Sequence, residues 1–293
     1  MSTLYGWLAD LADAGLLPEA FGYPFVARGF LAVLILAPLL GGISHLVVAR
    51  RLAFFSTAIG QAALTGLTIG LLLGEPLNAA YGGVIGFTLL VALFMVFVKR
   101  RSQLPPDTLI GVFMALTLGL GICLLVAVTK RFNIHQIEAI MFGSLLTVTE
   151  TDLVLLLVGA VGIGAALALR YNVLVIDSLS PPLARVRGAD PTASEYLFVL
   201  LVTVAITVSL KVIGALLVEA LVVVPAAAAR NLARSTRGYL WWSIATALIA
   251  CLAGLVVSME WRVPTGGAIV LVLAALFFVT LAAGGVRARL AQG

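Results

Sequence analysis

Long apolar stretches separated by short polar segments dominate the hydropathy pattern of this chain. Eight stretches contain at least 17 residues, and they cover 25–48, 52–74, 77–98, 108–128, 153–169, 196–229, 239–258 and 263–283. A helix needs about 20 mostly apolar residues to cross the hydrocarbon core of a bilayer. The pattern therefore predicts an all-α polytopic membrane protein in which these stretches form the transmembrane helices.

The stretch 196–229 does not fit a single span. Its 34 residues are too many for one crossing and few for two, and Lys211, Gly214, Glu219 and Pro225 interrupt it. We expect two short or broken helices here, one of which could re-enter the membrane from the side on which it began. The total is then eight or nine transmembrane helices.

Composition excludes several classes of soluble protein. Hydrophobic residues make up 62% of the 293 residues, and Asp, Glu, Lys and Arg together make up 11%. An average soluble protein has about 25% charged residues, so this chain could not cover the surface of a soluble fold. An ordinary cytosolic enzyme, a nucleic-acid-binding protein and a disordered protein are excluded. Cys123 and Cys251 lie inside apolar runs and predict neither a disulfide framework nor a zinc site.

The distribution of basic residues predicts the orientation of the spans, because Lys and Arg are concentrated in cytoplasmic loops. The chain has 18 Lys and Arg against 13 Asp and Glu, a net charge of +5. With the N-terminus outside, the inner group holds 13 basic residues: Arg50, Arg51, Lys99, Arg100, Arg101, Arg170, Arg185, Arg187, Arg230, Arg234, Arg237, Arg287 and Arg289. The outer group holds 4: Arg28, Lys130, Arg131 and Arg262. This orientation places the C-terminus inside.

Residues 1–24 differ from the stretches that follow, because Asp10, Asp13 and Glu19 occur there without Lys or Arg. A secretory signal peptide has a basic n-region, so we do not expect one. Spaced leucines predict instead an amphipathic helix on the membrane surface. We divide the chain into this N-terminal segment, a transmembrane domain over 25–284 and a cytoplasmic tail over 285–293.

A polar stripe runs along the second apolar stretch. Thr57, Gln61, Thr65 and Thr68 are separated by steps of 4, 4 and 3 residues, which places them on one face of a helix. Such a stripe either lines a polar path through the membrane or forms hydrogen bonds with a neighbouring helix. The sequence leaves both interpretations open.

Glu219 is the acidic residue that lies deep within an apolar stretch. A carboxylate is costly in a membrane and by default marks a functional site. It could bind a cation, border an aqueous cavity or pair with Lys211, although a separation of eight residues would require a bent or broken helix. Pro225, which follows, is consistent with a broken helix near a cavity.

Known enzyme and metal-binding motifs give little information on the function of this chain. The chain has no H-E-x-x-H, G-x-S-x-G or P-loop pattern, so any ATP that drives transport must bind to another polypeptide. His135 and Glu138 are three residues apart and could share a metal on one helical face. A solvated loop is the alternative interpretation of that pair.

The longest inner loop, residues 171–195, predicts a short cytoplasmic helix. Ser180 can cap a helix that has Pro181 at its first position, and Gly188 can end it. Leu183 and Val186 share one face, while Arg185 and Arg187 lie on others. Such a helix could dock on a partner protein or lie on lipid headgroups. Asp190 and Pro191 then begin the next helix.

Several segments in this order resemble the integral membrane permeases of bacterial ABC importers for zinc, manganese and iron. They are RRLAFFSTAIGQAALTG, PPDTLIGVFMALTLGLG, EAIMFGSLLTVTETDL, SLKVIGALLVEALVVVPAAAAR and VPTGGAIVLV. The resemblance extends from about residue 30 to residue 283. It implies a permease domain of the bacterial inner membrane that hydrolyses no ATP itself. It also implies a homo- or heterodimer of permeases, two cytoplasmic ATP-binding subunits and an extracytoplasmic metal-binding protein as partners.

The resemblance further implies that residues 178–188 form the coupling helix, with Ser180, Leu183, Arg185, Val186, Arg187 and Gly188 as docking residues. The chain departs from the family in the second span. The family usually has Asp and, four residues later, His facing the translocation path, where this chain has Thr57 and Gln61. Hydroxyl and amide oxygens are poor substitutes for the ligands that zinc prefers.

Three hypotheses fit this departure. The divalent cation could pass more fully hydrated, a different permease subunit could supply the Asp and His, or Glu219 could provide the charged ligand. The candidate metal contacts are therefore Thr57, Gln61 and Glu219, and we expect no cofactor in this chain. A self-contained secondary transporter that couples ions through Glu219 and Lys211 is the alternative function.

Overall fold

The computed structural model describes residues 24–76, 81–129, 148–179, 181–186, 188 and 190–290. The predicted amphipathic segment, apart from Pro24, lies outside the described residues, and so do His135 and Glu138. The described helices are α2 (Pro24–Ala49), α3 (Phe55–Leu72), α4 (Tyr81–Arg101), α5 (Pro106–Thr129), α7 (Glu150–Leu179), α8 (Pro181–Val186), α9 (Pro191–Ile213), α10 (Ala215–Leu232), α11 (Thr236–Trp261) and α12 (Thr265–Leu290).

Nine of these helices are long and apolar enough to cross a membrane. The described ranges contain no strand. The all-α fold class is therefore confirmed, and within the described residues the span count is the higher of the two predicted numbers. A helix satisfies its backbone hydrogen bonds within itself, which is why such apolar segments adopt this structure in lipid.

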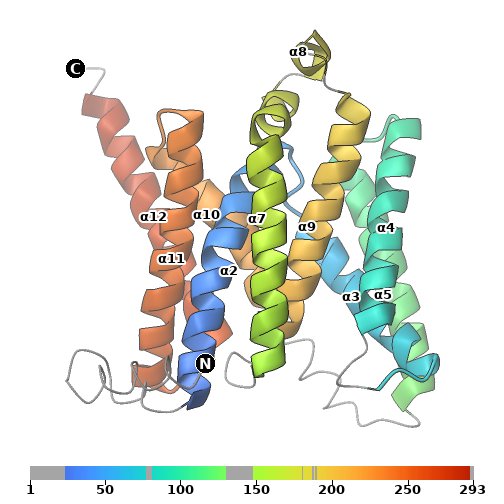
Figure 1. Cartoon of the computed structure of the whole chain (residues 1–293). Helices are drawn as coiled ribbons and strands as arrows, with labels where there is room; N and C mark the ends of the chain where they lie inside the picture. Colours follow the sequence, from blue (N-terminus) through green and yellow to red (C-terminus); the bar gives the residue numbers. More distant parts are fainter. Residues whose placement is uncertain are drawn as a thin grey trace.

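The helices form one bundle with a single short helix beyond one end. In Figure 1, α2, α7 and α9 occupy the middle of the view, with α11 and α12 on one side and α4 and α5 on the other. Helix α2 packs against α10 and α11, and α3 packs against both α4 and α5. Helix α8 lies past the upper end of α7. We call this end, which carries Arg50, Lys99, Arg100 and Arg185, the basic end.

Glycines bring α3 and α4 into backbone contact. A Cβ added to Gly83 of α4 would lie 2.5 Å from the Gly66 carbonyl oxygen and 2.6 Å from the Gly70 Cα of α3. Small residues at four-residue spacing permit such close approach of helices in lipid. Gly86, by contrast, faces open space. Helices α3 and α4 therefore pack as a closely fitted pair.

The stretch 196–229 forms two helices, as the sequence predicted. The break is at Gly214, which has a φ of 78° and separates α9 from α10. Positive φ costs little for glycine and much for other residues. Pro225 does not interrupt the helix, because α10 continues through it. The adjacent Ala226 N–H donates instead to the Ser44 hydroxyl at 3.1 Å.

Two helices extend beyond the predicted bounds of their apolar stretches. Helix α7 does not end near residue 169 but continues to Leu179, so the first part of the predicted loop 171–195 is helical. Apolar residues in 171–179 continue the helical pattern, which explains the extension. Helix α12 likewise runs through the predicted tail as far as Leu290.

Candidate cation path and docking surface

The polar stripe of α3 separates into two pairs with different environments. Thr65 and Thr68 are fully buried. The Thr65 hydroxyl donates to the Thr117 carbonyl of α5 at 2.7 Å, and the Thr68 hydroxyl donates to the Thr65 carbonyl at 2.7 Å. Thr57 and Gln61 are only half-buried. Hydrogen bonding to a neighbouring helix therefore explains Thr65, the Thr68 hydroxyl is satisfied within α3, and a polar path remains open only to Thr57 and Gln61.

Glu219 lies beside Thr57 of this second pair, on the neighbouring helix α10. The Thr57 side chain interacts with the Glu219 carboxyl group. Glu219 Oε1 also lies 3.5 Å from the position that a Cβ on Gly60 would occupy. The absence of a side chain at Gly60 thus leaves room for the carboxylate beside α3. The structure brings together Thr57 and Glu219, residues 162 positions apart in the sequence.

This arrangement presents oxygen atoms suited to a cation. A carboxylate, a hydroxyl and an amide carbonyl are ligands that hard divalent cations accept. The side-chain amide oxygen Oε1 of Gln61 is buried and accepts no hydrogen bond from the described residues. The described part of the chain contains no group of three or more His, Cys, Asp and Glu side chains able to hold a metal. One copy therefore offers a partial ligand set rather than a closed site.

Lys211 does not pair with Glu219 as the sequence allowed. Its ammonium group lies 3.1 Å from Asp152 Oδ1 in α7 and donates to the Tyr81 hydroxyl of α4. The Tyr81 hydroxyl donates in turn to Asp152 Oδ1 at 3.0 Å. Asp152 was not among the predicted site residues, because it lies just before the predicted fifth span. Its position beside an apolar run was the signal that could have identified it.

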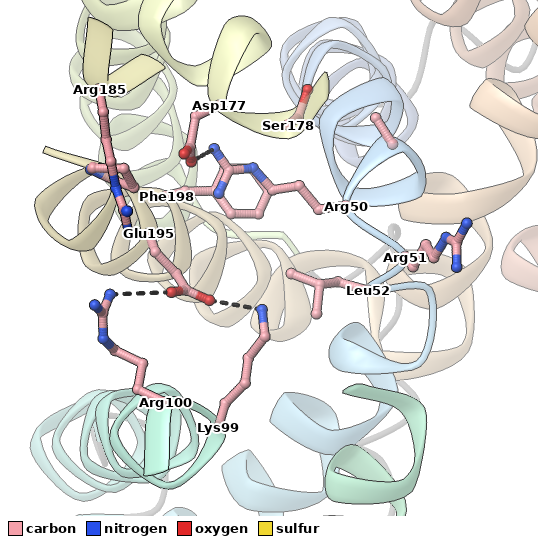
Figure 2. Close-up of a pocket in the computed structure, with 12 residues that line it drawn as sticks. Arg50, Arg51, Leu52, Lys99, Arg100, Asp177, Ser178, Arg185, Glu195 and Phe198 are labelled. Carbon is pink, nitrogen blue, oxygen red and sulfur yellow. Dashed lines mark hydrogen bonds and ion pairs between the residues drawn. The ribbon is translucent and has the colours of Figure 1, made fainter. Parts of the chain in front are cut away.

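Charged residues gather in a pocket at the basic end. The pocket has a volume of about 530 Å³ and lies between the ends of α2, α4 and α7 and the start of α9. Its cationic lining residues are Arg50, Arg51, Lys99, Arg100 and Arg185, and its anionic ones are Asp177 and Glu195. Figure 2 shows Glu195 held between Lys99 and Arg100, at 2.6 and 3.5 Å. The pocket therefore keeps an excess of positive charge.

Arg50 is the most deeply placed of these cations. Its guanidinium group binds Asp177 Oδ2 at 2.9 Å and the Leu174 carbonyl at 3.2 Å, both in α7. The guanidinium carbon lies 4.3 Å from the centre of the Phe198 ring in α9. Burial lowers the pKa of the Arg50 guanidinium, and the charge of Asp177 acts in the opposite direction. Arg50 thus joins three helices at the point where α2 ends.

The predicted docking helix is present as α8, Pro181–Val186. Arg185 and Val186 are exposed, Val186 to 85%. Ser180 and Arg187 lie outside the described residues, and so does the side chain of Leu183. Gly188 has a φ of 77°, and its N–H donates to the Arg185 carbonyl at 2.9 Å. The predicted role of Gly188 in ending the helix is confirmed.

The start of α9 also follows the prediction. The Asp190 carboxylate accepts the Thr192 N–H at 2.8 Å, with Pro191 at the first helical position. This hydrogen bond lowers the pKa of Asp190, because it stabilises the charged form. The segment from α7 to α9 is thus a helix, a sharp bend with α8 and a second capped helix.

His45 supplies no metal site with the residues around it. It is buried, and its ring lies 5.7 Å from the Tyr171 ring and 5.9 Å from the Tyr239 ring between centres. No carboxylate or thiol joins it in a cluster among the described residues. Glu219 therefore remains the charged candidate ligand within the bundle.

Proteins of similar sequence include named transport components. The chain is 29% identical over 259 residues to the high-affinity zinc uptake system membrane protein ZnuB of Haemophilus influenzae, covering 88% of this chain and 96% of that protein. It is 27% identical over 262 residues to the manganese import system permease protein ScaB of Streptococcus gordonii, covering 88% and 91%. The similarity therefore extends over most of this chain and most of each relative.

Solved structures share the fold. The PsaBC structure from Streptococcus pneumoniae in complex with Fab contains a chain that is 24% identical, with a TM-score of 0.77 and coverage of 94% of both chains. A putative metal-chelate type ABC transporter in an inward-facing conformation matches with a TM-score of 0.71, 16% identity and coverage of 87% and 84%. The model of the ABC 3 transport family matches residues 22–284, which include all nine spans apart from the last residue of the ninth. The chain, whose described residues form nine candidate spans and whose sequence matches the family model along nearly its whole length, belongs to the ABC 3 transport family.

Proposed function

We propose that this chain is the transmembrane permease subunit of an ABC importer that carries a divalent metal cation across the plasma membrane. A separate cytoplasmic ATPase would supply the energy, and an extracytoplasmic binding protein would deliver the metal. Membership of the ABC 3 transport family supports the class of transporter. The observation that supports a cation as the cargo is the position of the Glu219 carboxyl group beside Thr57, where both residues are half-buried on α3 and α10.

Glu219 would replace the acidic ligand that the second span lacks. Related permeases usually have Asp at the position of Thr57, and here a carboxylate approaches that position from α10 instead. This geometry favours the hypothesis in which Glu219 became the charged ligand. Since carboxylate, hydroxyl and amide oxygens suit manganese better than zinc, manganese is the favoured cargo.

Dimerisation would complete the ligand set. A single copy provides one carboxylate at this position, whereas two copies facing each other would provide two. Thr57 and Glu219 are half-buried, which leaves them accessible to a second permease. A homodimer would supply identical ligands, and a heterodimer could add the Asp and His of a more typical subunit.

The ATPase would dock on α8 at the basic end, which would then face the cytoplasm. The exposed Arg185 and Val186 would contact the ATPase, together with Ser180, Leu183, Arg187 and Gly188 of the same bend. The predicted orientation supports this, because 13 of the 18 basic residues belong to that side.

The direct test is uptake by proteoliposomes that contain the chain, its ATPase and its binding protein. We expect manganese uptake that requires ATP and is weakened by Val186→Asp, which places a charge on the exposed face of α8. Asp107→Asn at the start of α5, which changes a charge at the same end of the bundle but outside α8, is the control. Uptake by the chain alone, without any ATPase, would overturn the proposal and support a secondary transporter.

A second comparison tests the cargo. Thr57→Asp/Gln61→His restores the usual ligand pair in the second span and should shift the preference from manganese towards zinc. An unchanged ratio of zinc to manganese uptake in this double variant would place both residues outside the path.

A further inference from the structure

Helix α8 is tied on both sides to the helices that precede and follow α3, the helix that carries Thr57. Asp177 lies in the last turn of α7, just before α8, and Glu195 lies near the start of α9, just after it. Asp177 binds Arg50 at 2.9 Å, and Glu195 binds Lys99 at 2.6 Å. These two ion pairs connect the flanks of α8 to the end of α2 and the end of α4.

The turn at residues 50–54 leads directly into α3, the helix that carries Thr57, and backbone hydrogen bonds fix its conformation. Only residues 50–54 separate α2 from α3, and the N–H groups of Arg50, Arg51 and Leu52 donate to carbonyls of α2 at 3.0 to 3.1 Å. Arg51 has a φ of 57°, a strained conformation for a residue with a side chain. Thr57 follows in the first turn of α3. A displacement of Arg50 therefore shifts the start of α3 rather than being absorbed by a loose loop.

The second ion pair reaches the same helix by another route. Lys99 and Arg100 end α4, whose Gly83 is in backbone contact with Gly66 and Gly70 of α3. Because closely packed backbones shift together, a force on the end of α4 also acts on α3. Both flanks of α8 thus act on the α3–α4 pair, and through α3 on Thr57 and its contact with Glu219.

From this geometry we infer that Arg50 and Asp177 are positioning residues that transmit the movement of α8 to the cation path, with Lys99 and Glu195 as a parallel link. The Arg50–Asp177 pair is the main link, because its side chains are only 10% and 6% exposed, against 31% and 19% for Lys99 and Glu195. Water screens a buried pair less than an exposed one. The inference rests on the proposed docking of an ATPase at α8.

The test compares two aspartates at opposite ends of α7. Asp177 pairs with Arg50 at the basic end, and Asp152 pairs with Lys211 at the other end. The full transporter with Asp177→Asn or Asp152→Asn is reconstituted, and the manganese carried per ATP hydrolysed is measured together with Tm. For Asp177→Asn we expect ATPase binding and hydrolysis to persist while the ratio falls about threefold to thirtyfold. For Asp152→Asn we expect a lower Tm and an unchanged ratio.

The reversed pair Arg50→Asp/Asp177→Arg should recover at least part of the ratio, since it restores opposite charges at the same place. If Asp177→Asn does not fold, Arg50→Lys provides the second measurement, because it keeps the charge and loses the fixed two-point contact with α7. An unchanged ratio in the folded Arg50 and Asp177 variants overturns the inference, as does an equal fall for Asp152→Asn. Failure of the unaltered chain to bind any ATPase overturns the proposed function itself, so the two failures are distinguishable.

Discussion

Two carboxylates inside the bundle have opposite surroundings. Asp152 in α7 is neutralised by Lys211 and accepts hydrogen bonds from Tyr81 and from the Thr149 hydroxyl at 2.6 Å. Glu219 in α10 contacts Thr57 and forms no ion pair with the residues that the structure describes. A buried charge without a partner costs stability, so its retention requires another reason. We therefore propose that Asp152 supports the fold and that Glu219 serves transport.

The largest expected effect comes from removing the charge of Glu219. Glu219→Gln keeps the size of the side chain and should lower manganese uptake about 10- to 100-fold, the scale of a lost charge-assisted contact. The Tm should stay the same or rise, because an unpaired charge has been removed. A large fall in Tm with normal uptake would reverse the roles assigned to the two carboxylates.

The next largest effect should come from Gly83→Ala, which alters the position of α3 without touching either carboxylate. The added Cβ would meet the Gly66 carbonyl oxygen at 2.5 Å, and such overpacking costs about 1–3 kcal/mol. Thermal unfolding in detergent measures this loss. Gly86→Ala on the same helix meets nothing within 4 Å and should leave the Tm unchanged.

A smaller loss of stability is expected for Lys211→Met, which leaves Asp152 without its cation. Breaking a fully buried pair costs about 3–5 kcal/mol, but the Lys211 side chain is 34% exposed. With this screening we expect about 1–2 kcal/mol. Uptake per folded molecule should not change. A loss of uptake larger than that of Glu219→Gln would assign Lys211 to the transport path.

The smallest effect should come from Thr57→Val, which removes the hydroxyl beside Glu219 and keeps the shape. Loss of one hydrogen bond of about 1 kcal/mol corresponds to about a fivefold change in apparent affinity for manganese. Thr68→Val is the matched control on α3, because its hydroxyl bonds within the helix. Equal effects of the two variants on uptake would remove Thr57 from the path.

Several parts of the docking region followed from local sequence signals. Asp190 and Pro191 predicted the start of α9, and Gly188 predicted the end of α8. Capping and positive φ depend on residues within a few positions of each other, which is why the sequence was sufficient. The end of α7 was predicted too early, since the apolar pattern alone did not distinguish a span from its extension beyond the membrane.

The partners of charged residues could not be predicted in the same way. Lys211 has Glu219 eight residues away on the adjoining helix, yet its ion pair is with Asp152, 59 residues distant. Arg50 and Asp177 are 127 residues apart. Which helix faces which depends on the packing of all the spans, and periodicity within one helix does not contain that information.

The sequence by itself determined the membrane class, a span count of eight or nine and the family resemblance, because apolar length, basic-residue bias and local turn signals are properties of contiguous residues. It also identified Thr57, Gln61 and Glu219 as unusual polar residues within spans. Only the tertiary structure decided that Thr65 and Thr68 are packing contacts, that Glu219 lies against Thr57, and that Asp152 rather than Glu219 pairs with Lys211. These contacts depend on which helices are neighbours, and that arrangement is determined by the close packing of glycines and apolar faces across the whole bundle.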